Sequence, residues 1–194
     1  MLTTNSSVAS VGAGRLGVAI VGLGGAVAST AVAGVALLRA NQMKTTGLPL
    51  ADFPAELTTQ LAGYDDLVFG GWDLCPDDLA AAARHHRVLE PAQLAAAEAE
   101  LSALRPWPAV GNVRFCRNVT GQHLLPVESH AAAVEAIRAD LIRFRDEQNL
   151  ERVVVINLAS TEAAPVLTQD LFLTPAAFEA AVQANDERIP PAML

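Results

Sequence analysis

Three glycines between an apolar strand and an apolar helix are the residues of this sequence best suited to bind a ligand. Gly22, Gly24 and Gly25 follow the run Leu16–Val21 and precede an alanine-rich stretch of helical character. A strand that breaks at glycines and re-enters as a helix exposes backbone N–H groups at the helix start, where they and the helix dipole bind phosphate. Because small residues also let the backbone approach a pyrophosphate closely, the pattern predicts a dinucleotide-binding turn.

Other interpretations of the same stretch stay open at this point. Residues 16–38 carry no charge and are long enough to span a bilayer, and a basic start before an apolar run also mimics a secretory signal. The central glycines and the lack of a basic stop-transfer cluster argue against both. A plain buried strand–helix unit is a third alternative. The literal G-x-G-x-x-G at residues 12–17 precedes the strand. That motif binds a dinucleotide only where it follows a strand and opens a helix, so it is not taken as the binding turn.

Two further apolar runs are predicted strands that end in small or polar residues. One covers residues 67–69, and the other is the continuous run 152–156, which is typical of a strand in the middle of a parallel sheet. Ligands of such sheets bind beyond the carboxyl ends of the strands. We therefore expect the loops 22–25, 71–73 and 159–161 to converge on one site.

Helical patterns alternate with these strands. Proline and acidic residues predict a helix over 76–87, and others are expected at 92–104, 128–149 and 174–188, with a short one at 54–61. Residues 109–121 have no clear assignment. The alternation predicts an α/β fold with a Rossmann-like, doubly wound and mostly parallel sheet.

Asp73 is the polar side chain of most interest at these strand ends. It could accept hydrogen bonds from a ribose or amide of a cofactor, or it could cap the helix that opens at Pro76. The usual acid about 20 residues past the glycine turn is missing, which weakens an ordinary Rossmann assignment. Trp72 and Trp107 are expected to be packing residues.

The composition excludes several classes of function. The net charge of −8 and the pI near 4.9 disfavour a nucleic-acid surface. His85 and His86 are adjacent on a predicted helix and diverge too far to chelate one metal, so a solvated face and no metal site are expected. Cys75 and Cys116 are too few for a disulfide framework, which favours a reducing, cytoplasmic location. Lys44 is the only lysine.

Six segments, in order along the chain, together resemble a known family. They are IVGLGGAVAST at 20–30, LVFGGWDL at 67–74, RVLE at 87–90, LRPWPAV at 104–110, IRADLIRFRDEQNLERVVVINLASTE at 137–162 and NDERIPPAML at 185–194. This set resembles the N-terminal half of myo-inositol-1-phosphate synthase, also called inositol-3-phosphate synthase. The resemblance rests on the order of all six segments along the chain.

The resemblance implies an NAD-dependent isomerase of inositol and phospholipid biosynthesis. Members convert glucose 6-phosphate to 1D-myo-inositol 3-phosphate by oxidation, intramolecular aldol cyclisation and reduction, and the full-length enzymes are expected to be homotetramers. No membrane or nucleic-acid partner is implied. The cofactor-binding residues it implies are Gly22, Gly24, Gly25, Ala26, Val27, Asp73, Ala109, Val110, Ala159, Ser160 and Thr161.

The chain also departs from the family. Ala26, Val27 and Ala28 stand where members often have two asparagines and a glycine, so side-chain contacts to the cofactor are lost there while backbone contacts survive. The catalytic lysines and the tetramerising region correspond to sequence beyond Leu194, so catalytic residues are not assigned. We expect residues 1–14 to be a flexible tail and 15–194 to be the NAD-binding domain of a truncated sequence, inactive alone. An NAD-dependent dehydrogenase-like protein and a non-enzymatic nucleotide-binding remnant are the alternatives.

Overall fold

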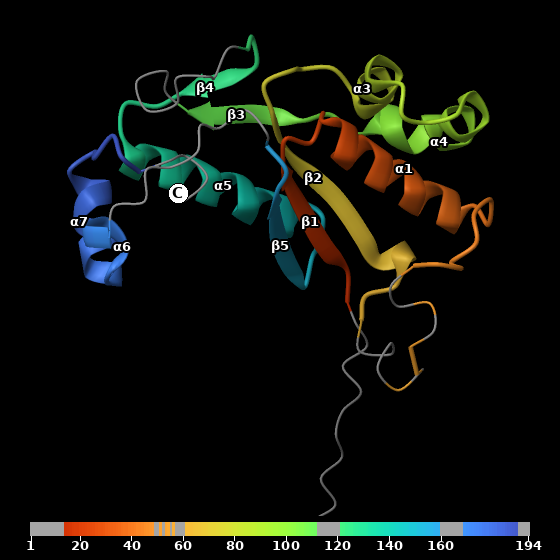
Figure 1. The fold of residues 1–194 in the computed structure, drawn as a ribbon, viewed down its shortest axis with the longest axis horizontal. Coiled ribbons are helices and arrows are strands. Elements are labelled where there is room, and N and C mark those ends of the chain that lie inside the picture. Colours follow the sequence, from red (N-terminus) through yellow and green to blue (C-terminus); the bar gives the residue numbers. More distant parts are fainter. Residues whose placement is uncertain are drawn as a thin grey trace, which may run out of the picture.

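The fold is a five-stranded parallel sheet with helices on both faces (Figure 1). The computed structural model describes residues 14–48, 51, 53–54, 56, 61–111, 121–159 and 169–189. The strand order is β4-β3-β2-β1-β5. The predicted Rossmann-like α/β class is confirmed. Residues 1–13 of the expected tail at 1–14, most of the expected helix at 54–61 and Cys116 lie outside the described residues.

Strand β1 (Leu16–Val21) is an interior strand of the sheet, and helix α1 (Ala26–Arg39) follows it after the glycine turn. β1 pairs with β2 (Leu67–Asp73) on one side and with β5 (Arg152–Asn157) on the other. The membrane-spanning interpretation of this stretch is wrong, because the apolar run is a strand, a turn and a helix. In the part of the chain that the structure describes, no helix is both long and apolar enough to cross a membrane.

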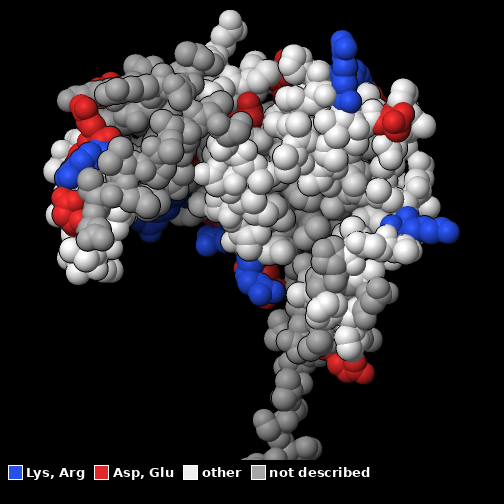
Figure 2. All heavy atoms as spheres, viewed as in Figure 1, with Lys and Arg blue, Asp and Glu red and all other residues white. Residues whose placement is uncertain are grey.

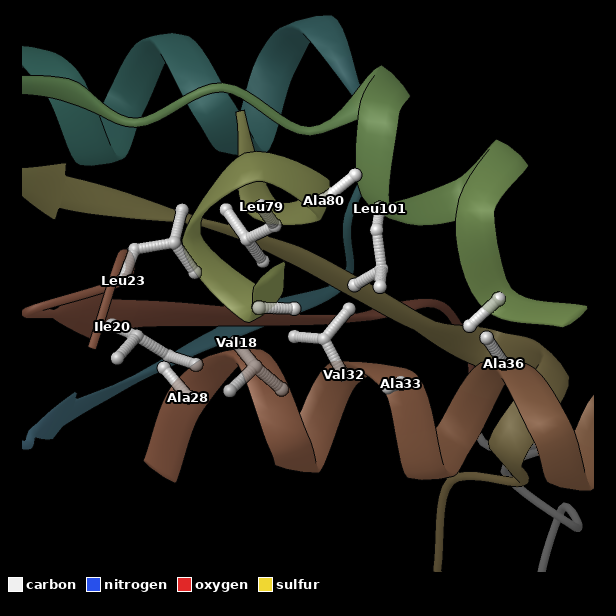
Figure 3. Close-up of a cluster of buried hydrophobic side chains, with 12 residues drawn as sticks. Val18, Ile20, Leu23, Ala28, Val32, Ala33, Ala36, Leu79, Ala80 and Leu101 are labelled. Atoms are coloured by element: carbon white, nitrogen blue, oxygen red, sulfur yellow. The ribbon is translucent and has the colours of Figure 1, made fainter. Parts of the chain in front are cut away.

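One face of the sheet is covered by α1, α3 (Leu79–His86) and α4 (Pro91–Ala103). Valine and isoleucine side chains from β1 meet small alanines of α1, and this lets the helices approach closely (Figure 3). The cluster contains Val18, Ile20, Leu23, Ala28, Val32, Ala33, Ala36, Leu79, Ala80, Ala83, Ala97 and Leu101.

Helix α5 (His130–Glu147) covers the opposite face. Ser129 caps it by accepting a hydrogen bond from the N–H of Ala132. Phe144 and Trp72 are buried here, and Trp107 packs edge-on against Trp72 with ring centroids 4.9 Å apart. Both tryptophans are therefore packing residues, as predicted.

Helix α3 begins later than its sequence pattern predicts. The Asp78 side chain accepts the N–H of Ala81, so Asp78 is the N-cap and Leu79 the first helical residue. The proposal that Asp73 caps this helix is wrong.

Four strands differ from the sequence prediction. β2 continues through both glycines to Asp73, and β3 (Trp107–Gly111) and β4 (Leu124–Pro126) were not predicted. β5 is the edge strand of the described sheet, not a central one. Val154, Val155 and Ile156 are 42–51% exposed, because no described element covers them.

The chain ends in two short helices, α6 (Gln169–Phe172) and α7 (Pro175–Gln183). Thr174 caps α7 as its position before a proline suggests. The predicted helix to residue 188 is too long, since Asn185 adopts a left-handed conformation with φ of 55°. Before β2, a 3₁₀ turn, η1 (Tyr64–Asp66), is held by Arg39, which donates to the carbonyl of Tyr64.

Candidate cofactor site

The glycine turn is fixed to the neighbouring strand by its backbone. The N–H groups of Gly22 and Leu23 both donate to the carbonyl of Trp72, at 2.9 and 3.0 Å. Gly22 has a φ of +86°, which glycine adopts without strain, and the N–H of Gly25 donates back to its carbonyl at 3.0 Å. The Leu23 side chain is fully buried and points into the first core cluster (Figure 3). The turn is thus anchored by both hydrogen bonds and packing.

The start of α1 offers backbone donors to a ligand. Gly25 is the N-cap and has no side chain to satisfy the first N–H groups, and the first turn contains no acid. The N–H groups of Ala26, Val27 and Ala28 have no acceptor within the helix. Val27 is 65% exposed, so this end of the helix opens to solvent. Such an end suits a phosphate group.

Asp73 joins the end of β2 to this turn. Its Oδ2 accepts the N–H of Gly24 at 2.8 Å, and its Oδ1 accepts the N–H of Cys75 at 3.0 Å. Each carboxylate oxygen retains a further lone pair for a ribose hydroxyl. Asp73 also ends the strand next to β1, which is the place of the ribose-binding acid in a Rossmann fold. The structure thus places an acid at this strand end, 49 positions after Gly24, because a long connection follows α1.

The shape of the turn requires glycine. A Cβ at Gly24 would lie 3.1 Å from the Asp73 carboxylate carbon, and one at Gly25 would lie 3.1 Å from the carbonyl oxygen of Gly22. At Gly22 a Cβ would lie 3.3 Å from the nitrogen of Ala159. Side chains here would fill the space through which a pyrophosphate approaches. The residues present therefore fit a dinucleotide.

The third predicted loop also meets the turn. The N–H of Leu158 donates to the carbonyl of Val21 at 2.9 Å, and Ala159 follows beside Gly22. Within the described residues, the expected convergence of the three strand ends is confirmed. Ser160 and Thr161 lie outside the described residues.

Ala109 and Val110 lie elsewhere in the sheet. They belong to β3, which pairs with β2, so β2 separates them from the glycine turn. The N–H of Ala109 donates to the carbonyl of His123, and Val110 packs in the core beneath α5. Their contact with a cofactor stays a prediction.

His86 is a residue at the site that the sequence pattern did not identify. His85 and His86 are both exposed, as expected, but the Nε2 of His86 lies 2.9 Å from the carbonyl oxygen of Gly24. The contact depends on how α3 packs on α1, which has no local signal in the sequence. The described residues contain no group of three or more metal-ligating side chains.

The surface over α1 bears little charge. In the view of Figure 2, charged side chains are scattered around the molecule. Within α1, Arg39 in the last turn is the only charged residue. No acidic side chain of the helix's first turn therefore repels an anion at its N-terminus.

A glycine turn after the first strand, an open helix N-terminus and an acid on the adjacent strand define a Rossmann-like dinucleotide-binding domain. Residues 52–194 match the family model of an NAD-binding domain described as myo-inositol-1-phosphate synthase. Inositol-3-phosphate synthase 1 of Bacteroides thetaiotaomicron is 36% identical over 191 residues, which cover 93% of this chain. The human enzyme of that name is 32% identical over 176 residues, covering 76% of this chain. The chain belongs to the myo-inositol-1-phosphate synthase family.

Solved structures support the same fold. The inositol-3-phosphate synthase of Caenorhabditis elegans superposes with a TM-score of 0.77 at 22% identity, covering 92% of this chain and 40% of that one. A myo-inositol-1-phosphate synthase-related protein from Thermotoga maritima superposes with a TM-score of 0.57. The chain spans 44% of the bacterial relative and 31% of the human one.

Proposed function

We propose that the glycine turn and Asp73 hold NAD for the reaction of an inositol-3-phosphate synthase. The family's NAD-binding domain is what the chain contains, and NAD is its cofactor. The observation that supports the site is the Asp73–Gly24 hydrogen bond, which fixes the turn while the helix N–H groups stay open. The names of the relatives support an inositol 3-phosphate as the product, and the family resemblance implies glucose 6-phosphate as the substrate and the 1D-myo form of the product.

Each part of the site has a distinct role in this proposal. The N–H groups of Ala26 and Val27 bind the pyrophosphate, Gly22, Gly24 and Gly25 leave room for it, and Asp73 accepts ribose hydroxyls. Ala159, beside Gly22, lines the site, and the family resemblance adds Ser160, Thr161, Ala109 and Val110 as cofactor contacts. NAD, when bound, supplies reversible hydride acceptance, so that oxidation and reduction balance over the reaction.

This chain does not supply the lysines that the ring closure uses. Lys44 is its only lysine, and stabilising an enolate and a phosphate together takes several cations. We therefore propose that the chain binds NAD but does not turn over glucose 6-phosphate alone. A cytoplasmic location and a homotetramer are proposed for the whole enzyme from the family resemblance.

Titration of the protein with NAD by calorimetry tests the proposal. Gly24→Asp places a second carboxylate beside Asp73 and the pyrophosphate, and we expect binding to weaken at least about 30-fold. Gly34→Ala is the matched control, because a Cβ there meets nothing within 4 Å. Equal NAD affinity in Gly24→Asp and the wild type would show that the turn is not the cofactor site.

A further inference from the structure

The peptide between Gly24 and Gly25 is held at both of its polar ends. Its N–H, on Gly25, donates to the carbonyl of Gly22 at 3.0 Å. Its carbonyl oxygen, on Gly24, lies 2.9 Å from Nε2 of His86, 62 positions away in sequence. A carbonyl only accepts, so the Nε2 of His86 carries the proton of this hydrogen bond.

This peptide directly precedes the first open donor of the site. The N–H of Ala26 belongs to the next peptide, so a rotation at Gly24 or Gly25 redirects the donors that face the ligand. Glycine gives the backbone its widest conformational freedom, and two in succession need an external restraint. Ala26 and Val27 have no polar side-chain atoms, so the direction of their N–H groups alone decides how well a phosphate is bound.

The position of His86 is itself fixed by the fold. α3 starts at its cap Asp78, and Leu79, Ala80 and Ala83 pack its inner face against α1. The helix ends at Arg87, which takes a left-handed conformation with φ of 55° and donates its N–H to the carbonyl of Ala83. His86 is therefore the last helical residue, and it reaches the turn from α3, whereas Asp73 reaches it from β2.

We propose that His86 is a positioning residue of the cofactor site, which locks the Gly24–Gly25 peptide so that the α1 N–H groups point at the pyrophosphate. The inference rests on the proposed NAD site and adds a residue to it. Together with Asp73, which binds the N–H of Gly24, His86 clamps Gly24 through both its nitrogen and its oxygen.

Three variants separate positioning from general effects of a surface histidine. His86→Ala removes the donor, and His86→Gln keeps an amide donor on a side chain of comparable reach. His85→Ala is the matched control, since His85 is the exposed neighbour and its described contact is with the His86 ring. Two quantities are measured for each: NAD affinity by calorimetry, and amide hydrogen exchange of Gly24 and Gly25 without NAD.

We expect His86→Ala to weaken NAD binding about five- to tenfold and to speed exchange at Gly24 and Gly25 by a similar factor. His86→Gln should recover most of both, and His85→Ala should match the wild type within about twofold. Unchanged NAD affinity in His86→Ala, or an equal loss in His85→Ala, would overturn the inference. A wild-type protein without NAD affinity would overturn the proposed function, and the exchange rates would still show whether His86 restrains the turn.

Discussion

The carboxylate of Asp73 accepts the N–H of Gly24 at 2.8 Å and so joins two strand ends that lie 49 positions apart in sequence. Through this hydrogen bond, the conformation of the glycine turn depends on the position of the end of β2. The Asp73 side chain therefore contributes both to the stability of the fold at the carboxyl ends of β1 and β2 and to the shape of the site.

Asp73→Asn tests this dual role. Its amide retains one acceptor oxygen, so only one of the two N–H groups, of Gly24 or of Cys75, keeps its partner. We expect the free energy of unfolding to fall by about 1–2 kcal/mol, measured by urea denaturation, together with weaker NAD binding. Asp77→Asn, at an exposed site nearby, should change stability by less than about 0.5 kcal/mol. Equal effects of the two variants would contradict the role of Asp73.

Gly71 is the glycine on which the pairing of β1 and β2 depends. It has a φ of +148°, and a Cβ there would fall on the carbonyl oxygen of Ile20 and 2.6 Å from its nitrogen. We expect Gly71→Ala to lose more than about 3 kcal/mol of stability or to prevent folding, as seen by circular dichroism.

Gly47 supplies the control for that substitution. Its φ is +88°, but a Cβ there would meet nothing within 4 Å. Gly47→Ala therefore introduces backbone strain without a clash, and about 1–2 kcal/mol should be lost. A mild effect at both positions would contradict the close approach of β1 and β2.

Local signals were enough to predict the first half of the fold. β1 has the predicted bounds and α1 is the predicted alanine-rich helix, because glycines that indicate a turn separate the two apolar runs. β3 and β4 were missed because Pro108 and Pro126 occur within them, and prolines normally argue against a strand. The apolar run of β5 indicated a central strand, since hydrophobicity reports a tendency to be buried and not the order of strands.

The candidate site likewise has parts that the sequence predicts and parts that it does not. The glycine turn and Asp73 are both visible in the sequence, because turn chemistry and strand ends are local features. Their hydrogen bond is not, because the pairing of β1 with β2 is a long-range contact. His86 was assigned to a solvated face for the same reason, as its contact depends on the packing of α3 against α1.

Asp140 connects α5 to the strand that holds the turn. Its Oδ2 accepts the indole N–H of buried Trp72 at 2.8 Å, and its Oδ1 lies 2.7 Å from Arg143, whose guanidinium covers the Trp107 ring. Asp140→Ala leaves a buried indole donor without this acceptor. The free energy of unfolding, measured in urea, should therefore fall by about 1–3 kcal/mol. Glu135→Ala removes an exposed carboxylate from the same helix and should cost under about 0.5 kcal/mol. If Asp140→Ala leaves the free energy of unfolding unchanged, water replaces the carboxylate as the acceptor of the Trp72 N–H.

Arg188 makes the acid stability of the C-terminal helices depend on Asp186. The hydrogen bonds from Arg188 lower the pKa of Asp186 from 3.8 to about 2. Because the folded pKa is the lower one, this contribution is present above about pH 4 and is lost as the pH falls towards 2. Arg188→Gln should raise the pKa of Asp186 towards 3.8 in an NMR titration. Arg138→Gln is the control and should leave the pKa of Asp186 unchanged. An unchanged pKa of Asp186 in Arg188→Gln would show that Arg188 and Asp186 do not pair in solution.

The free edge of β5 should make the isolated chain self-associate. Val154, Val155 and Ile156 are 42–51% exposed on the edge strand of the described sheet, and such an edge is a template for pairing with another strand. Val155→Lys puts a charge on this edge, so sedimentation velocity at rising concentration should show less self-association at unchanged melting temperature.

Val153→Lys distinguishes a surface effect from a loss of packing on the same strand. Val153 is partly buried and packs into the cluster of Trp72 and Phe144 beneath α5. A lysine there must bury its ammonium or disrupt the cluster, so the melting temperature should fall and association should increase. If Val155→Lys associates as the wild type does, the edge is not the contact. If both variants destabilise equally, Val155 is covered in solution as Val153 is, since the two side chains lie on the same face of β5.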